Sequence, residues 1–368
     1  MSSEPLTAVP PADAPGNRPS VSRPDALSPA ALADARRHQP LRGLIGLAFV
    51  VPVTVLLSVG AGGAFHSLIL LGPIITFALP VMAMIAFWWE DWPGTLLPRP
   101  WSGLYDTVIV AAGGVVLAAL GRLVVSGPDL IGVFTPDPGA YPATEPLAGG
   151  IFTIMLHLTL VCERRPLDGF GRVPAGLAAL VLCWALGLIA WLAVAVRSHA
   201  VPPENYGAWF TSIGLWQMIF YVALRGWPFT RIGRRWLRLL LGNVVVIACG
   251  WGGYLLAADG LAWPGTRITA VAGTGIGCVL LVSMLFEGWP AIRMTDRLAP
   301  GRAIVLSVAA TLTALLGWSL PMLAHALGVP QEREWGWSTQ VTLNALSTAV
   351  ILHVAVWRRW PARTRPPG

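Results

Sequence analysis

Residues 67–93 read SLILLGPIITFALPVMAMIAFWWEDWP, and this stretch decides the class of fold. Its first 23 residues, 67–89, carry no charged side chain. An α-helix of about 20 such residues crosses the ~30 Å hydrocarbon core of a bilayer. The whole chain shares this character: 55% of its 368 residues are hydrophobic and only 12% are charged, about half the charged fraction of a soluble domain. The sequence therefore predicts an integral membrane protein and argues against a soluble domain, a disulfide scaffold and a coiled coil.

Ten apolar stretches of similar length follow the first 41 residues. They cover residues 43–61, 67–89, 103–126, 147–163, 174–196, 208–225, 237–257, 268–287, 303–324 and 337–357. Each is expected to be helical, because unpaired backbone N–H and C=O groups are not tolerated in lipid. Barrel strands would need only about ten alternating residues each. The predicted fold class is an all-α polytopic membrane protein with about ten transmembrane helices.

The predicted domain organisation has three parts. Residues 1–41 contain eight prolines and no apolar periodicity, so they are predicted to be a disordered cytoplasmic tail. This segment lacks the charged start and short apolar core of a signal peptide, which makes the stretch at 43–61 the first membrane anchor. Residues 42–361 form the transmembrane helical bundle, and residues 362–368 form a short cytoplasmic tail.

All 25 basic residues are arginine, and their distribution predicts the orientation. All but four lie on one side of the membrane when the ten spans are placed as above; the exceptions are Arg122, Arg197, Arg267 and Arg333. Positive charge collects on the cytoplasmic side, so both termini are predicted to be cytoplasmic. The basic residues are spread over several short segments, which argues against a nucleic-acid partner. The arginine-only usage with abundant Ala, Gly and Pro is typical of a GC-rich bacterial genome, and hence of a bacterial inner membrane.

A four-residue motif, Glu/Arg-x-Trp-Pro, recurs at the ends of the five even-numbered stretches, with Arg replacing Trp in the second copy. The copies start at Glu90, Glu163, Arg225, Glu287 and Arg358 and end at Pro93, Pro166, Pro228, Pro290 and Pro361. Proline ends a helix, and tryptophan prefers the headgroup layer. One copy for each pair of stretches predicts five tandem parallel hairpin repeats. Two inverted five-helix halves would instead pair the second stretch with the seventh, which has no copy.

The first residue of each motif copy carries a charge near the C-terminus of a helix. This end is partially negative, so Arg225 and Arg358 are favoured, whereas Glu90, Glu163 and Glu287 each cost about 0.3–1 kcal/mol unless compensated. We expect at least two of the glutamates to pair with arginines from other hairpins, as a structural clamp or a charged gate. The alternative is a simple stop-and-anchor signal at the membrane interface.

Two histidines lie inside the predicted spans at nearly the same depth. His157 and His353 lie nine and eight residues before the prolines of their motif copies, a difference of about 1.5 Å along a helix. Two such side chains could ligate a haem or a metal ion, but buried histidines more often form hydrogen bonds between helices. The four cysteines form no CxxC or Cys/His zinc spacing. We therefore predict no cofactor and keep the two histidines as the candidates for one.

Five further polar side chains lie within the predicted spans. They are Gln217, Tyr221, Asn243, Gln340 and Asn344. Intramembrane polar groups are candidates for a solute path, and they are also the usual contacts between packed helices.

The functional prediction rests on the number of spans and on these polar residues. The sequence contains no P-loop, zinc-protease, nucleophile-elbow or aspartate-rich prenyl-diphosphate motif, which disfavours an enzyme. A transporter or permease for a small or amphipathic solute is the favoured class. Two alternatives stay open: a membrane scaffold or accessory subunit, and a membrane haem or metal redox protein. Beyond the lipid bilayer, the predicted partner is a small solute or another membrane protein.

Overall fold

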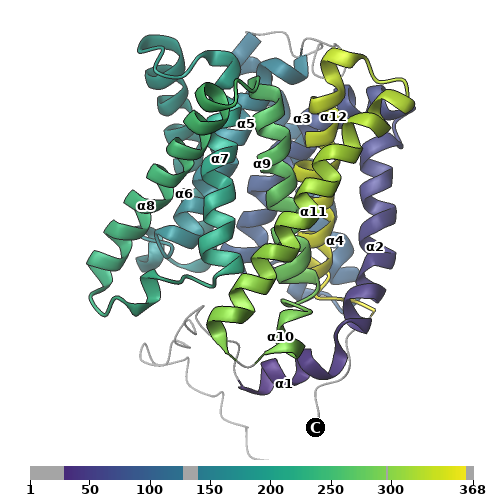
Figure 1. The fold of residues 1–368 in the computed structure, drawn as a ribbon, viewed down its shortest axis with the longest axis vertical. Helices are drawn as coiled ribbons and strands as arrows, with labels where there is room; N and C mark the ends of the chain where they lie inside the picture. The colour runs from purple at the N-terminus through teal and green to yellow at the C-terminus, as the bar shows by residue number, and fades with distance from the viewer. Residues whose placement is uncertain (1–28, 127–139, 296, 362–368) are drawn as a thin grey trace, which may run out of the picture.

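The computed structural model describes residues 29–126, 140–295 and 297–361, and this part of the chain is helical with no strand. Nine of its helices are long and apolar enough to cross a membrane, and they run side by side as a bundle (Figure 1). They cover Leu41–Val59, Ala64–Trp88, Trp101–Val125, Thr144–Val161, Arg172–Arg197, Arg235–Gly260, Gly265–Leu285, Leu298–Ala326 and Gln331–Val356. The prediction of a helical multi-pass membrane protein is confirmed.

Most of these helices combine α-helical and π-helical segments. The α-helices are α1 (Pro29–His38), α2 (Leu41–Val59), α3 (Ala64–Ala83), α4 (Trp101–Ser126), α5 (Ala140–Leu156), α6 (Arg172–Ala190), α7 (Tyr206–Gln217), α8 (Arg235–Leu255), α9 (Gly265–Leu280), α10 (Ala291–Met294), α11 (Leu298–Ala326), α12 (Glu334–Thr339) and α13 (Ser347–Ile351). The π-helical segments are η1 (Met84–Trp88), η4 (His157–Val161), η6 (Trp191–Arg197), η8 (Met218–Ala223), η10 (Leu256–Gly260), η11 (Leu281–Leu285), η13 (Gln340–Leu346) and η14 (Leu352–Val356). Short 3-10 turns are η2 (Gly94–Leu96), η5 (Leu167–Gly169), η7 (Pro203–Asn205), η9 (Phe229–Arg231) and η12 (Gln331–Arg333).

The predicted span at 208–225 is also helical but is less apolar than the nine. It runs without a break through α7 and η8. It packs against α5, α8 and α9 and buries the polar side chains of Thr211, Ser212 and Gln217. Because protein rather than lipid surrounds most of this helix, polar side chains can be satisfied within the bundle.

The membrane helices form two layers. In the helices Ala64–Trp88, Thr144–Val161, Gly265–Leu285 and Gln331–Val356, 67–78% of the residues in an 18-residue apolar stretch are buried. In the other five, which contain α2, α4, α6, α8 and α11, only 17–28% are buried. The first group and α7 therefore form an inner layer, and the second group forms an outer layer that presents apolar side chains to lipid.

The inner helices close into a ring. α3 contacts α5, α5 contacts α7, α7 contacts α9, α9 contacts α12, and α12 contacts α3 again. Outer helices approach this ring closely where they carry glycine: Gly114 of α4 lies against Ala78, and Gly250 of α8 lies against Ile213. Small residues of this kind allow helix backbones to approach in membranes.

The structure differs from expectation in the segment 1–41. Residues 1–28 lie outside the described part, but α1 is a helix that lies with α10 at one end of the bundle (Figure 1). Ala35 and Gln39 are 1% exposed, and the Nε atom of Arg36 donates to the carbonyl of Ile292 at 2.8 Å. Polar anchoring of this kind leaves no apolar periodicity in the sequence, which explains why composition alone predicted disorder.

Candidate functional site

The five motif copies share one backbone conformation. In each copy the inner helix ends in a π-helical segment, and the first two motif residues have positive φ values between 50° and 83°. The N–H of the second residue donates to the carbonyl six residues earlier, as from Asp91 to Ile85 at 3.0 Å. The other four copies form the same bond at 2.7–2.9 Å, and the peptide bonds before all five motif prolines are cis. Left-handed residues reverse the chain and satisfy carbonyls at a helix end.

Glu163 pairs with two arginines from another part of the bundle. Its Oε2 atom lies 3.0 Å from Nε of Arg235, and its Oε1 atom lies 2.8 Å from Nη2 of Arg238. Both arginines belong to the first turn of α8, whereas Glu163 follows η4. The carboxylate thus joins the end of one inner helix to the start of an outer helix.

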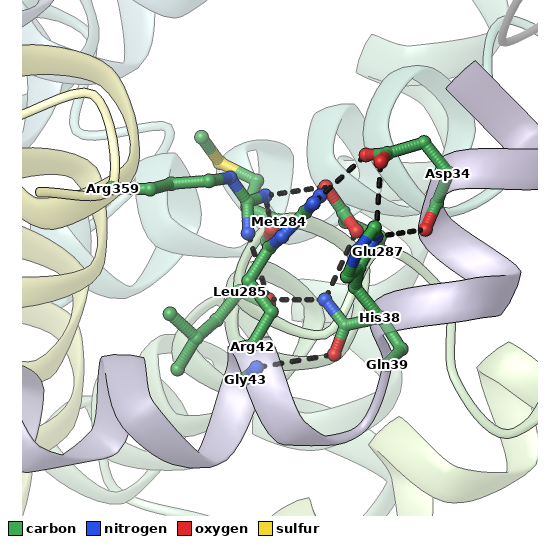
Figure 2. A network of polar contacts seen from close by, with 9 residues as sticks. All are labelled: Asp34, His38, Gln39, Arg42, Gly43, Met284, Leu285, Glu287 and Arg359. Atoms are coloured by element: carbon green, nitrogen blue, oxygen red, sulfur yellow. Dashed lines mark hydrogen bonds and ion pairs between the residues drawn. The ribbon is translucent and has the colours of Figure 1, made fainter. Parts of the chain in front are cut away.

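Glu287 lies at the centre of a larger network (Figure 2). Its carboxylate lies 3.5 Å from Nη1 of Arg42 and 3.1 Å from Nη2 of Arg359, and it accepts a hydrogen bond from Nε2 of Gln39 at 3.0 Å. The Arg359 guanidinium also donates to the carbonyls of Met284 and Leu285. This network joins the start of α2, the end of η11 and the end of η14.

Asp34 extends the network onto α1 (Figure 2). Its carboxylate lies 2.9 Å from Nη2 of Arg42 and 3.0 Å from Nδ1 of His38. Burial disfavours the charged carboxylate, but the hydrogen bonds and charges of Arg42 and His38 outweigh it and lower the pKa of Asp34. The charged form of Asp34 is therefore the one that fits this position.

The other three motif charges are held differently. Glu90 is 65% exposed and lies 3.9 Å from guanidinium nitrogens of Arg164 and Arg172. Arg358 pairs with a different carboxylate, that of Asp91, at 2.8 Å. Arg225 forms no ion pair within the described part of the chain and lines a small cavity. All three motif glutamates thus contact arginines from other segments, closely at Glu163 and Glu287 and at 3.9 Å at Glu90, and none of these partners is Arg225 or Arg358.

Burial raises the pKa of Asp91, although the hydrogen bond and charge of Arg358 act in the opposite direction. The 2.8 Å contact between Nε of Arg358 and Oδ2 of Asp91 has the geometry of a charge-assisted bond. We regard the pair as an ion pair between the ends of the first and last inner helices.

His157 is held by two amide side chains. Its Nε2 atom lies 2.8 Å from Oδ1 of Asn243, and its Nδ1 atom lies 2.9 Å from Nε2 of Gln217. The Oδ1 atom of Asn243 can only accept a hydrogen bond, and the Nε2 atom of Gln217 can only donate one. The arrangement therefore fits a neutral His157 ring whose proton is on Nε2 of the imidazole. Three candidates from the sequence, on η4, α7 and α8, therefore form one hydrogen-bonded group inside the bundle.

His353 lies among different neighbours. It is 1% exposed, its ring centroid is 5.1 Å from that of Phe49, and it packs beside Gly46 of α2. The two histidines therefore contact different helices. Within the described residues, no group of three or more His, Cys, Asp or Glu side chains is placed to hold a metal ion.

The remaining polar candidates also contact protein groups. Asn344 donates to Oε1 of Gln340 at 2.9 Å, and Gln340 donates to the carbonyl of Leu57 at 3.2 Å. The Tyr221 ring stacks on Phe229, at 5.8 Å between centroids. The bond from Gln340 joins η13 to α2, as polar groups in membrane bundles commonly do, whereas the Asn344 bond lies within η13.

A groove of about 940 Å³ lies between α7, α9 and α11 and faces the surroundings of the bundle. Its walls are mostly apolar, and several of the side chains are small. The lining residues include Leu215, Val271, Gly275, Ala310, Ala314 and Gly317. Trp318 and Met322, at its edge, are 70% and 57% exposed. An exposed apolar rim of this kind places the groove at the lipid-facing surface.

Arg267 is the one charged residue among the described residues that line the groove. The guanidinium carbon of Arg267 lies 4.3 Å from the ring centroid of Trp263 and 5.4 Å from that of Trp335. Within the described part of the chain Arg267 forms no ion pair, and no carboxylate lines the groove. From the sequence alone, Arg267 is only an exception to the charge asymmetry. The Trp-Pro pair at Trp263, four residues before it, was the overlooked signal.

No protein-family model, curated protein or solved structure matches this chain.

Proposed function

We propose that the protein is a permease-like membrane protein that binds an amphipathic solute with an anionic head group in the groove between α7, α9 and α11. The observation that carries this proposal is the pairing of a long apolar groove with a single arginine. The apolar walls suit an acyl chain or a similar hydrocarbon, and Arg267 suits a carboxylate or a phosphate.

The setting of Arg267 favours an anionic ligand. Stacking between Trp263 and Trp335 uses the faces of the guanidinium and leaves its N–H edges free to donate. A planar guanidinium binds carboxylate and phosphate through two parallel hydrogen bonds. A positive charge such as that of Arg267, with no carboxylate partner at the edge of the bilayer hydrocarbon, is unfavourable in free energy. A bound anion would remove this unfavourable contribution.

The internal organisation proposed from the sequence supports a carrier made from one chain. We infer five tandem parallel hairpins from the five matching turns and from the closed ring of inner helices. We also infer that both termini are cytoplasmic and that the membrane is a bacterial inner membrane, because all but four arginines then face the cytoplasm. Arg267 then lies at the outer face.

The motif charges are arranged as a clamp between helices of this chain, and they are less suited to a scaffold that binds the helices of partner proteins. Glu163 and Glu287 are engaged by arginines of the same chain, which leaves them poorly placed to hold partner helices. The redox alternative has less support, because both ring nitrogens of His157 already contact amide groups.

Binding of oleate tests the proposal directly. The purified protein should bind oleate and should bind oleyl alcohol, which has the same chain but no charge, much more weakly. Arg267→Gln should weaken oleate binding about tenfold to a hundredfold, since a hydrogen bond to a charged group contributes about 1.5–3 kcal/mol. Arg197→Gln removes an exposed arginine from η6, outside the groove, and should leave the affinity unchanged.

A second pair of variants tests the groove itself. Ala310 and Thr311 are adjacent and exposed on α11, but only Ala310 lines the groove. Ala310→Trp should therefore block oleate binding, and Thr311→Trp should not. Equal affinity for oleate and oleyl alcohol, or equal effects of the two tryptophans, would contradict the proposal.

A further inference from the structure

A second cavity, far smaller than the groove, lies where α1, η8, η11 and α11 meet. Its volume is about 110 Å³. Four arginines from three parts of the chain line it: Arg36 of α1, Arg225 at the end of η8, and Arg297 and Arg302 at the start of α11. None of the described residues that line it is acidic.

Two details indicate that the cavity is arranged for a ligand. The Oγ atom of Ser283 is buried and has no hydrogen-bond partner in the described structure, and Ser283 lines the cavity. Arg225 is the one motif charge without an ion pair in that part of the chain, although the corresponding Glu163 and Glu287 each have two arginine partners. A hydroxyl and a guanidinium are both suitable donors to an oxyanion.

We infer that this cavity is a binding site for a phosphate group. Arg225 and Arg302 are like charges beside one small cavity, and Arg225 forms no ion pair among the described residues. A multiply charged anion would accept hydrogen bonds from Arg225 and offset the repulsion between the two charges. The size excludes a nucleotide and suits a phosphate or a phosphomonoester. Basic pockets between membrane helices also bind lipid head groups, so the phosphate could be free in solution or belong to an anionic lipid.

The inferred site links anion binding to α1. Leu32 and Arg36 line the cavity from α1, and Arg36 also bonds to the carbonyl of Ile292 beside it. A bound phosphate would therefore hold α1 against η8 and α11. This gives a readout that does not depend on any solute in the groove: hydrogen exchange of the α1 backbone should slow when phosphate binds.

The test uses the full-length protein in detergent and in nanodiscs. In detergent, inorganic phosphate is titrated by calorimetry at constant ionic strength, because screening alone would otherwise change the signal. In nanodiscs of phosphatidylcholine with a small fraction of phosphatidic acid, native mass spectrometry measures which lipid stays bound. The first arm reports a free phosphate and the second a lipid phosphate.

Arg225→Gln should weaken binding at least tenfold in whichever arm shows it, and it should abolish the protection of α1. Arg234→Gln is the matched control. Arg234 lies nine residues after Arg225, is exposed and does not line the cavity. If Arg225→Gln does not fold, Arg297→Gln replaces it, since Arg297 is an exposed member of the lining. Absence of binding in both arms, or equal losses in the lining and control variants, would overturn the inference.

Discussion

The carboxylate of Glu287 lies 3.1 Å from Nη2 of Arg359, so one ion pair joins the ends of the fourth and fifth inner helices. Only 19% of the Glu287 side chain and 17% of the Arg359 side chain are exposed. Removing one partner of such a pair leaves a charge that is partly desolvated and unpaired.

Glu287→Gln should therefore lower the free energy of unfolding by about 1–3 kcal/mol, more than the 0–1 kcal/mol of an exposed pair. Glu90→Gln is the matched control, because Glu90 has the same motif position but is 65% exposed and 3.9 Å from its arginines. A double-mutant cycle with Arg359→Gln measures the coupling energy. Equal effects of the two glutamate variants would show that the clamp has no energetic role.

The two arginine partners of Glu163 should differ in their contributions. Arg238 is 22% exposed and Arg235 is 47% exposed, and solvent screens the more exposed charge. Arg238→Gln should lower the thermal unfolding temperature in detergent by more than Arg235→Gln does. The reverse order would contradict the assignment of Arg238 as the main partner.

His157→Ala would remove one hydrogen-bond partner from the amide of Gln217 and one from that of Asn243, inside the bundle. The expected cost is about 1–3 kcal/mol in the free energy of unfolding. His66→Ala, which removes an exposed histidine, should cost little. We also expect purified protein to show no haem absorption band. A haem spectrum lost on His157→Ala would instead support the redox alternative.

Gly250 and Gly252 of α8 test the close packing of the two layers. A Cβ atom at Gly250 would lie 2.7 Å from the Cα atom of Ile213, whereas at Gly252 it would meet nothing within 4 Å. Gly250→Ala should therefore destabilise the protein. Gly252→Ala should be neutral or stabilise it by up to about 1 kcal/mol, because alanine favours helix. Thermal unfolding in detergent distinguishes the two outcomes.

The proposed orientation can be checked by labelling with a reagent that does not cross membranes. Gly233 and Ala200 are exposed and lie at opposite ends of the bundle, before α8 and after η6. In intact cells, Ala200→Cys should be labelled and Gly233→Cys should not, with the wild type as background. The opposite pattern would reverse the orientation.

The membrane class and most of the helices could be predicted from the sequence because bilayer thickness imposes a length and a composition on each span. The charged ends at Glu163 and Glu287 could also be predicted, since a glutamate at a helix C-terminus requires compensation. Their partners could not, because Arg238 and Arg42 are distant in sequence and depend on how the helices pack.

Other features depend on tertiary contacts that leave no local pattern. The docking of α1 rests on single polar contacts such as that of Arg36 with Ile292, which composition does not reveal. The groove around Arg267 arises only where α7, α9 and α11 meet. His157 was a candidate from its depth alone, but its bonding to Gln217 and Asn243 required three helices to be placed.

Photolabelling of the groove tests the proposed function most directly. A photoreactive oleate analogue, activated on the protein in nanodiscs, should label residues of the groove such as Val271 and Ala314. Excess oleate should suppress the labelling, oleyl alcohol should not, and Arg267→Gln should reduce it about tenfold or more. Labelling spread evenly over lipid-facing residues such as Val116 and Val181, with no effect of Arg267→Gln, would contradict the account.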